Sequence, residues 1–346
     1  MTATTLSIDL NAIVANWRAL DALSAATVET SAVVKADGYG LGAGPVAAAL
    51  AKAGARSFFV ALAEEGVAVR KAVGNAPAIY VFSGLVQNDA LLMRDYNLIP
   101  LLNSAKQLVK LRMQAPDLAY GVQIDTGMSR LGMELSEFIM VRDKIAKADL
   151  IISHLACADE PDHAQNAQQL HNFNAMTRGV SIRRSLSATG GILLGADYHF
   201  DLVRPGIGLY GAAPFKDATP VINISIPVIQ TRKIAAGQTV GYAALWTAKR
   251  PSKIATLAAG YADGLIRAMG DGGLMVWAGN TPCPIVGRVS MDLITVDITD
   301  LDRVPDHMEI INAHQGVDHV AKAAGTIGYE ILTSLGARYK RDYRGG

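Results

Sequence analysis

Between residues 30 and 212, short apolar and branched runs alternate with stretches in which apolar residues recur at helical spacing. Stretches such as AEEGVAVRKAV and NSAKQLVKLRMQ predict helices between the runs. Eight strand–helix units in about 200 residues predict a (β/α)8 TIM-type barrel. The predicted strands are SAVVK (31–35), SFFVAL (57–62), AIYVFS (78–83), LIPLL (98–102), AYGVQID (119–125), IISHL (151–155), RSLS (184–187) and LVRPGIGLY (202–210).

After Pro214 the pattern changes to branched, alternating runs separated by Gly, Pro and Asn. Runs such as PVINISIPVIQTRKI, SKIATLAAG and LITVDIT predict a mostly β domain of about 120 residues. The N-terminal run TTLSIDL resembles these strands, so we expect it to pair with the second domain. We therefore expect a barrel over residues 11–214 and a mostly β domain formed by residues 1–10 and 215–346.

The composition of the 346-residue chain argues against several classes of partner. Lysine plus arginine total 32 and aspartate plus glutamate total 31, which gives no support for a nucleic-acid partner or an acidic membrane surface. No apolar run approaches the roughly 18 residues of a membrane span, and we see no secretory signal. Because only Cys157 and Cys283 are present, far apart, we expect a cytoplasmic protein with reduced thiols.

The stretch AVVKADGYGLG, residues 32–42, places Lys35 at the end of the first predicted strand. In a (β/α)8 barrel, the C-terminal ends of the strands carry the chemistry. A lysine held there, in a poor dielectric or near other cations, has a depressed pKa and can form a Schiff base with an aldehyde. Position alone favours the simpler alternative, a solvated lysine at a strand end.

The glycines of the same stretch suggest a second function. Gly38, Gly40 and Ala43 fit the loose G-x-G-x-x-G/A fingerprint of dinucleotide-binding proteins. The acidic candidates Glu64 and Glu65 come later than the usual spacing of about 20 residues, and a lysine at the strand end is not part of that fingerprint. A dinucleotide-dependent oxidoreductase is therefore disfavoured.

Five motifs occur along the chain in the order VVKADGYGLG, IDTGMSRLG, VRPGIGLYG, GYADG and GRVSMD. Together they closely resemble the signatures of alanine racemases, and the resemblance continues to IGYEILTSLGARY near the C-terminus. It implies a barrel that binds pyridoxal 5'-phosphate, followed by a β domain. It also implies an alanine substrate, a homodimer with each active site built across the interface, and a role in supplying D-alanine for bacterial peptidoglycan.

Racemisation removes a weakly acidic Cα proton and returns one to the other face, so it needs two bases on opposite faces. The resemblance implies that Lys35 carries the cofactor and serves one face, and that Tyr261 of GYADG, from the other subunit, serves the second. Without the motif, Tyr261 would be interpreted as a half-buried structural tyrosine. Tyr39 resembles the tyrosine that hydrogen-bonds the cofactor phosphate, and the glycines beside it let the backbone turn tightly.

Arg204, in VRPGIGLYG, matches the arginine that faces the pyridine nitrogen in this family. An arginine is effectively always protonated and has no acceptor, so it favours an unprotonated ring nitrogen and limits side reactions. Gly206 and Ile207 match backbone amides that contact the phosphate. Where the family often has Asn-Ser, this chain has Ala188 and Thr189, and the Thr189 hydroxyl can still reach phosphate.

His154, in IISHLACADE, matches a histidine that packs against the cofactor ring and orients Tyr261. With Cys157, Asp159 and His163 it could suggest a metal site. The spacing of these residues is no recognised zinc pattern. We therefore expect no metal.

Two further positions match the family's substrate contacts. Arg130, in DTGMSRLG, matches the arginine that contacts the cofactor's phenolic oxygen and the substrate carboxylate, for which a guanidinium fork is suited. Met291, in VSMD, matches a position whose backbone amide meets substrate in the partner's site. Many relatives brace the arginine with a carbamylated lysine, but this chain has Gln123, which cannot supply that negative charge.

The C-terminal stretch departs from the family in a way that bears on specificity. A tyrosine that some relatives place near the substrate methyl aligns with Ala337. Loss of the ring could enlarge the pocket, so we expect some tolerance for serine or other small amino acids. Tyr339 could instead fill that space, and the sequence leaves this alternative open.

Two other functions share parts of this pattern. Non-catalytic pyridoxal-phosphate carriers are similar single barrels, but they lack a second domain and the GYADG tyrosine. Decarboxylases with a similar barrel-plus-β plan would be expected to carry a catalytic cysteine and a long glycine-rich phosphate motif. Only the fragment GGI at residues 190–192 is present here, so a racemase is favoured.

Overall fold

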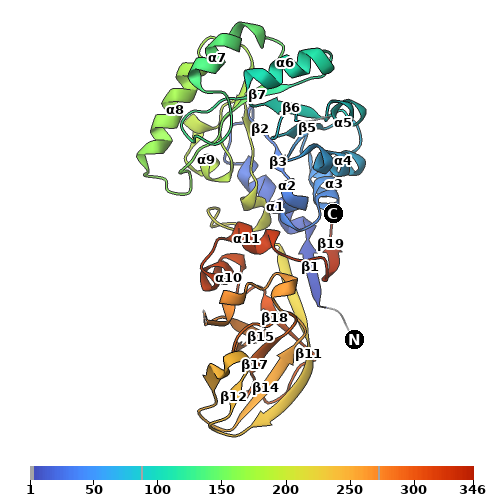
Figure 1. The fold of residues 1–346 in the computed structure, drawn as a ribbon, viewed down its shortest axis with the longest axis vertical. Helices are drawn as coiled ribbons and strands as arrows, with labels where there is room; N and C mark the ends of the chain where they lie inside the picture. The colour runs from blue at the N-terminus through green and yellow to red at the C-terminus, as the bar shows by residue number, and fades with distance from the viewer. Residues whose placement is uncertain (1–3, 87–88, 272) are drawn as a thin grey trace. The chain divides into compact units, whose positions relative to one another are not determined.

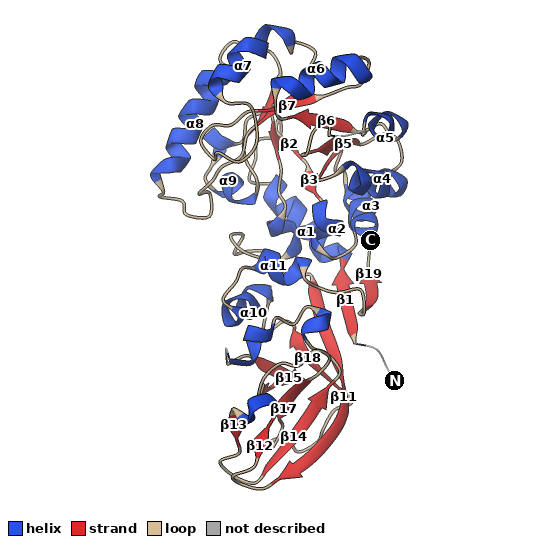
Figure 2. Cartoon of the chain, in the orientation of Figure 1, coloured by secondary structure: helices blue, strands red, loops and turns tan. Residues whose placement is uncertain are grey.

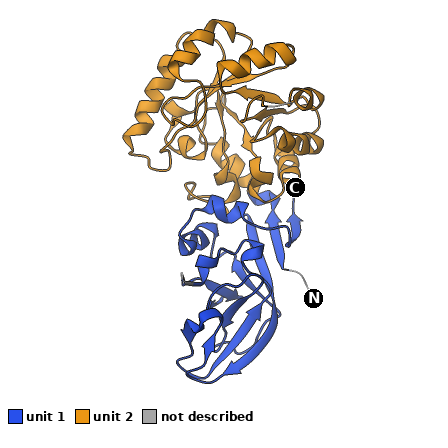
Figure 3. Cartoon of the chain, viewed as in Figure 1, with its two compact units in different colours: residues 1–12, 220–345 blue, residues 13–219, 346 orange. Residues whose placement is uncertain are grey.

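The computed structural model describes residues 4–86, 89–271 and 273–346. The chain divides into two compact units (Figure 3). One unit, hereafter the barrel unit, consists of residues 13–219 with Gly346, and the other, hereafter the β unit, consists of residues 1–12 and 220–345. Each unit is described by itself below.

Within the described residues of the barrel unit, seven strands form one parallel sheet in the order of the sequence (Figure 1). Helices lie around these strands (Figure 2), and they begin and end close to the predicted helical stretches. The strands are β3 (Ala32–Val33), β4 (Ser57–Val60), β5 (Ala78–Val81), β6 (Ile99–Leu102), β7 (Gly121–Gln123), β8 (Leu150–Ile152) and β9 (Arg183–Ser185). The helices are α1 (Leu10–Asp21), α3 (Ala43–Ala53), α4 (Ala63–Val73), α5 (Ala90–Asp95), α6 (Ala105–Gln114), α7 (Leu135–Val141), α8 (Ala164–Thr177) and α9 (Thr189–Leu193).

An eighth strand position closes the ring. Strand β10 (Leu202–Val203) runs parallel to β2 (Glu29–Thr30), which directly precedes β3. On its other side, the Arg204 amide donates to the Ser187 carbonyl at 2.8 Å, just beyond β9. The predicted (β/α)8 barrel is thereby confirmed.

The barrel strands are shorter in the structure than predicted, and two of these differences place functional residues in turns. The first predicted strand included Lys35, but β3 ends at Val33 and Lys35 begins a separate turn. The eighth was predicted over residues 202–210, but Pro205 has no N–H to continue the ladder. The chain there leaves β10 after Val203 and forms the 3-10 helix η3 (Ile207–Tyr210).

In the β unit, the N-terminal strand β1 (Thr5–Asp9) runs antiparallel to the long strand β11 (Ile222–Ile234) and parallel to β19 (Lys340–Arg344). The N-terminal run thus pairs with strands of the β unit. Strands β18 and β19 and two short helices were not predicted. The remaining elements include β14 (Ser252–Leu257), β15 (Met275–Ala278), β16 (Thr281–Pro284), β17 (Ile294–Asp297), β18 (His307–Ile311), α10 (Val317–Ala324) and α11 (Gly328–Thr333).

Among the described residues, no helix has both the length and the apolar character needed to cross a membrane. In the barrel unit, three aromatic side chains, from β4, β5 and the residue that follows β5, stack on one another. Phe59 stacks on Tyr80 at 4.7 Å and on Phe82 at 5.4 Å between ring centroids. Rings in these arrangements are favourable beyond their burial, and they form the floor on which Lys35 lies.

Arg70 of α4 shows how the outer layer is attached to the barrel. Its guanidinium donates to the carbonyl oxygens of Gly74 (2.7 Å), Pro77 (2.8 Å), Tyr96 (2.9 Å) and Asn97 (2.8 Å). The residue is 5% exposed. One buried cation therefore satisfies four carbonyl groups in the loops that lead into β5 and β6.

We predict that Arg70→Met lowers the free energy of unfolding by about 3 kcal/mol, because it leaves buried carbonyl groups without donors. The midpoint of thermal unfolding should fall by roughly 8 °C. Arg94→Met is the matched control, since the Arg94 side chain is exposed and donates one bond, to Gln114 at 3.2 Å. Equal effects of the two substitutions, measured by calorimetry, would contradict this account.

Candidate active site

Lys35 lies at the C-terminal end of the first barrel strand. Its Nζ is 5.8 Å from the centroid of the Phe82 ring. Burial lowers the pKa of Lys35 below the usual 10.5, and the positive charges of Arg130 and Arg204 lower it further, while Glu65 raises it. The amine therefore loses its proton more readily than a solvated lysine, as a nucleophilic or basic lysine requires. Lys35 is half-buried, which differs from the fully solvated lysine of the simpler alternative.

The chain after Lys35 forms an unusual left-handed turn. The φ angles of Ala36, Asp37, Gly38 and Tyr39 are 52°, 52°, 63° and 54°. Glycine adopts this region freely, but for other residues it costs about 1–2 kcal/mol each. The expectation that glycines make this turn is therefore only part of the explanation, because three of the four residues carry side chains.

Side chains from both sides hold the turn in place. The Asp37 carboxylate accepts from the Ala43 amide at 2.8 Å. Glu65 accepts from the Ala36 amide with one oxygen and from the Ala61 amide with the other, both at 2.7 Å. Glu65 thus links the residue after Lys35 to the end of β4, and its negative charge faces the lysine.

Hydroxyl groups and loop amides lie close together beside this turn. The Tyr39 ring stacks on Tyr210 at 4.5 Å, and a Cβ placed on Gly206 would lie 2.4 Å from the Tyr39 hydroxyl. The Thr189 hydroxyl oxygen accepts from the amides of Gly206 (3.1 Å) and Gly208 (3.3 Å). Hydroxyl groups and loop amides gathered in this way suit an oxyanion such as phosphate.

Arg204 introduces a buried positive charge into the barrel. It is 1% exposed, and its guanidinium donates to Ser153 O at 2.6 Å, to Leu186 O at 3.3 Å and to the Ser185 hydroxyl. Burial lowers the pKa of Arg204 to about 9. Across the described residues, no carboxylate forms an ion pair with it. An unpaired buried cation is costly, so this site favours a ligand that accepts hydrogen bonds or carries negative charge.

His154 belongs to the same cluster of positive charge. Burial, and then Arg204, Arg130 and Lys35, lower the pKa of His154 to about 3. The imidazole is therefore neutral at physiological pH. In the described part of the chain, no three His, Cys, Asp or Glu side chains are placed to hold a metal ion. His163 instead accepts from the Gln165 amide at 3.1 Å at the start of α8.

Arg130 is exposed in the loop that follows β7. Asp125 shapes this loop by accepting from the amides of Gly127 (2.8 Å) and Met128 (2.9 Å). Gln123 donates to the Leu131 carbonyl at 3.3 Å, whereas its side-chain oxygen is buried without a hydrogen-bond partner. Gln123 thus braces the loop backbone next to Arg130.

Tyr261 and Met291 lie in the β unit, on two neighbouring loops. Their side chains are 41% and 54% exposed. Tyr261 begins the 3-10 helix η5 (Tyr261–Asp263). The Tyr261 amide donates to Ser290 O at 3.0 Å, and the Ala262 amide donates to Met291 O at 2.9 Å. The two candidate residues are therefore held to each other through backbone.

Sequence reasoning missed Glu65 as a site residue. Its signal was present, because a glutamate at the third position of a helix commonly caps the preceding amides. Glu65 occupies that position in α4, and its other carboxylate oxygen accepts from the amide of Ala36, which is 29 residues earlier in the chain. That long-range contact could not be read from local spacing.

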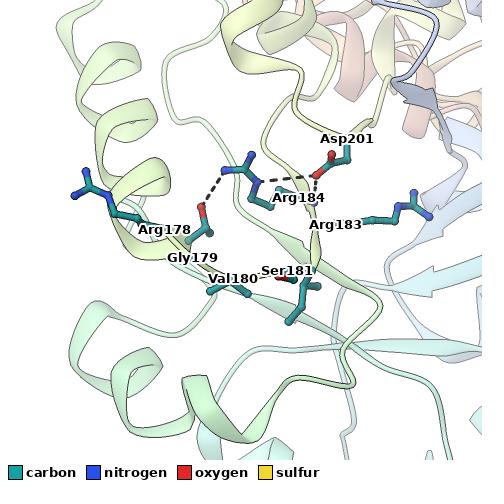
Figure 4. Close-up of a pocket in the computed structure, with 9 residues that line it drawn as sticks. Arg178, Gly179, Val180, Ser181, Arg183, Arg184 and Asp201 are labelled. Atoms are coloured by element: carbon teal, nitrogen blue, oxygen red, sulfur yellow. Dashed lines mark hydrogen bonds and ion pairs between the residues drawn. The ribbon is translucent and has the colours of Figure 1, made fainter.

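A separate hollow of about 450 Å³ lies at the opposite ends of the barrel strands, between the end of α8 and the start of β9 (Figure 4). Arg183 and Arg184 line it, but Arg183 pairs with Glu29 at 2.7 Å and Arg184 lies 3.9 Å from Asp201. These two arginines are thus already paired with carboxylates. None of the arginines that line the hollow is buried, whereas Arg204 in the site around Lys35 is.

Comparisons with known proteins agree with the motifs over nearly the whole chain. The family model described as alanine racemase, N-terminal domain, matches residues 8–214, and the model described as alanine racemase, C-terminal domain, matches residues 221–343. The alanine racemase of Ruegeria sp. (strain TM1040) is 57% identical over 345 residues, with 99% of each chain covered. That of Dinoroseobacter shibae is 58% identical over 348 residues, covering 100% of this chain and 99% of the relative.

Solved structures give the same result. The alanine racemase from Bartonella henselae with covalently bound pyridoxal phosphate is 38% identical, with a TM-score of 0.93 over 99% of this chain and 100% of that one. The biosynthetic alanine racemase from Pseudomonas aeruginosa is 34% identical, with a TM-score of 0.91 over the full length of both chains. These likenesses extend through both compact units.

We predict that Glu65→Gln lowers the pKa of Lys35 further, because Glu65 raises this pKa in the parent. The pH dependence of acetic anhydride labelling at Lys35, read by mass spectrometry on cofactor-free protein, measures it. The parent midpoint should lie below that of the unfolded chain, and the variant midpoint lower still. Glu64→Gln removes the same charge from an exposed neighbour and should leave the midpoint in place. A raised midpoint in Glu65→Gln would show that Glu65 does not act on the lysine by its charge.

Proposed function

This chain belongs to the alanine racemase family, and we propose that it interconverts L-alanine and D-alanine with pyridoxal 5'-phosphate as its cofactor. The observation that carries the proposal is Lys35, an amine with a lowered pKa beside the unpaired charge of Arg204. An electrophilic aldehyde and a negatively charged phosphate both suit this environment. The family models match both compact units, including the loop that carries Tyr261.

The residues present fit the cofactor. Lys35 would hold it covalently, and Tyr39, Thr189 and the amides of Gly206 and Ile207 would hold its phosphate. The Tyr39 and Thr189 hydroxyls, which both lie beside Gly206, support this assignment. When bound, pyridoxal phosphate supplies a conjugated ring system that takes up the negative charge left at Cα by proton removal.

Arg204 and His154 would act on the ring of the cofactor. Arg204 has no acceptor and stays protonated, so it can only donate, which matches a ring nitrogen that carries no proton. His154 is neutral because burial and three nearby cations lower its pKa to about 3. A neutral imidazole adds no further positive charge beside the ring and can pack against it.

Two bases would then share the proton transfer. The Lys35 amine takes or returns the Cα proton on one face, and its lowered pKa increases the unprotonated fraction. The phenol of Tyr261 serves the other face. Arg130 binds the substrate carboxylate with its guanidinium, and the backbone amide of Met291 contacts the substrate.

We infer a homodimer in which Tyr261 and Met291 of each subunit serve the barrel of the other. Tyr261 and Met291 are both substantially exposed on the β unit, which supports their contact with the barrel of another subunit. The product, D-alanine, would supply peptidoglycan synthesis in the cytoplasm. A non-catalytic carrier is disfavoured because the second domain and the GYADG tyrosine are present.

The proposal predicts that purified protein supplied with pyridoxal phosphate converts L-alanine to D-alanine in heavy water and introduces deuterium at Cα. Lys35→Ala and Tyr261→Phe should each lower inversion by at least about 100-fold, because each removes one of two general bases. A chiral assay follows D-alanine, and NMR follows deuterium.

Comparing deuterium exchange with inversion separates the parts of the proposal. Deuterium exchange without inversion in the parent protein would keep the cofactor and one base and reject Tyr261 as the second. Neither exchange nor inversion in a parent that binds the cofactor would reject alanine racemisation and favour the carrier.

Ala337 favours a substrate specificity that is broader than alanine alone. This residue is exposed on the β unit, whereas Tyr339 is 5% exposed, so the Tyr339 ring is packed inside the unit and does not stand in for a tyrosine at position 337. The space left by the missing ring supports the expectation that serine and other small amino acids are accepted.

We predict that the parent protein racemises serine measurably. Ala337→Tyr should lower kcat/KM for serine about tenfold relative to alanine, because a tyrosine ring would take up pocket space that the larger side chain needs. Rates for alanine, serine and valine, each with parent and variant, test this. A parent active on alanine alone would contradict the prediction. Ala337→Ser, which adds little volume, is the control.

A further inference from the structure

Arg338 connects the two loops that carry Tyr261 and Met291. Its Nε lies 2.8 Å from Oδ1 of Asp263, and its Nη2 donates to Oδ2 of the same carboxylate at 3.2 Å. Its Nη1 donates to Oδ1 of Asp292 at 2.6 Å. One guanidinium therefore bridges the loop of residues 260–264 to the loop of residues 290–293.

We propose that Arg338 is a positioning residue that fixes the Tyr261 phenol relative to the substrate-contacting loop through Asp263 and Asp292. This inference rests on the proposed role of Tyr261 as the second base. All the contacts that support it lie within the β unit.

Asp263 links Arg338 to the turn that carries Tyr261. It is 3% exposed, and its Oδ2 also accepts from the Gly260 amide at 2.9 Å. The carboxylate thus closes the short 3-10 turn that begins at Tyr261. Because the charge is buried, it needs the cation of Arg338, and loss of that cation would leave a desolvated carboxylate at the base of the loop.

The backbone leaves little free space between the two loops. A Cβ at Gly260 would lie 2.3 Å from Ser290 O and 2.4 Å from Met291 O. The Tyr261 amide donates to Ser290 O at 3.0 Å. A shift of one loop would therefore disturb the other, and the side chains of Tyr261 and Met291 move as one group.

The segment before Arg338 holds the same loop from a third side. The Gly336 amide donates to Asp263 O at 3.2 Å. Gly264 has a φ of 95°, and a Cβ there would lie 2.2 Å from Ser334 O. Residues 334–338 thus contact the loop through backbone and through the arginine side chain.

An arginine suits this place for a geometric reason. A planar guanidinium presents donors in a fixed fork, so it can bind one carboxylate with two N–H groups and a second carboxylate with another. A lysine ammonium carries the same charge without that fork. Charge and geometry can therefore be separated by comparing the two side chains.

Loss of the bridge has a specific kinetic consequence. Misplacement of a catalytic group by about 1 Å can lower the rate about 100-fold. Only proton transfer at the face of Tyr261 would be affected, because Lys35 lies in the other unit. The enzyme would then exchange the Cα proton of one alanine enantiomer at the Lys35 face without inverting it.

The experiment uses the cofactor-loaded enzyme in heavy water, with L-alanine and D-alanine tested separately. Arg338→Met, Arg338→Lys and Asp292→Asn are compared with the parent and with Tyr261→Phe. Arg250→Met is the matched control, since Arg250 forms an exposed pair with Asp300 at 2.5 Å in the same unit and touches neither loop. Amide hydrogen exchange at residues 260–264, followed by mass spectrometry, reports on the loop independently of activity.

Arg338→Met should lower kcat/KM for inversion about 100-fold, with most of the loss in kcat. The ratio of deuterium exchange to inversion should rise for one enantiomer, and amide exchange at Tyr261 and Ala262 should become faster. Arg338→Lys should recover part of the rate, and Asp292→Asn, which leaves buried Asp263 paired, should show a smaller change of the same kind. Arg250→Met should match the parent in every readout.

Equal losses of exchange and inversion for both enantiomers in Arg338→Met would overturn the proposal, since they indicate general damage to the enzyme. If Arg338→Met does not fold, Asp292→Asn tests the proposal in its place. A ratio of deuterium exchange to inversion and an amide protection equal to those of the parent in Asp292→Asn would reject the bridge. The role of Tyr261 is tested separately by Tyr261→Phe. If that variant inverts alanine normally, Tyr261 is not the second base, and the positioning role falls with it. If it does not while the Arg338 variants behave as the parent, only the positioning role fails. The proposed function itself is rejected only if the parent does not invert alanine.

Discussion

A desolvated cluster of positive charge in the barrel is the constraint on which the rest of the site depends. Arg204 is buried without an ion-pair partner among the described residues. Burial, and then the charges of Arg130 and Arg204, lower the pKa of both Lys35 and His154. Like charges in a poor dielectric repel, so the amine and the imidazole lose their protons more readily than in water. Hydrogen bonds to carbonyl and hydroxyl acceptors offset part of the desolvation cost of Arg204, and an anionic ligand would neutralise its positive charge.

The left-handed turn after Lys35 follows from the same requirement. The amine must reach the charged cluster, and groups able to bind an anion must lie next to it. Reversal of backbone handedness brings the Tyr39 ring onto Tyr210 and its hydroxyl beside Gly206, within four residues of the lysine. The strain of about 1–2 kcal/mol for each non-glycine residue is opposed by charge-assisted hydrogen bonds to Asp37 and Glu65, which are among the stronger bonds available to a backbone amide.

The sequence predicted the barrel and the residue types of the site because both depend on local patterns. Lys35 is recognisable from the strand that precedes it and the glycines that follow. Its strained backbone was not, since Ala36 and Asp37 favour right-handed conformations and adopt the other hand only through contacts with Ala43 and Glu65. Likewise, the bridge from Arg338 to Asp263 joins residues 75 positions apart, and no spacing rule connects them.

The two proposed bases differ in how their positions can be fixed. Lys35 is part-buried, so the barrel packing that lowers its pKa also restricts its side chain. Tyr261 is 41% exposed on its own unit, and packing there cannot hold the ring to the same degree. Its position must therefore be set through the backbone that carries it. The buried carboxylate of Asp263, the close approach of Gly260 to residues 290 and 291, and the fork of Arg338 all act on that backbone. When its backbone is rigid, an exposed base is already in position before substrate binds. Substrate binding then does not have to order the base, and this is the advantage of pre-organisation.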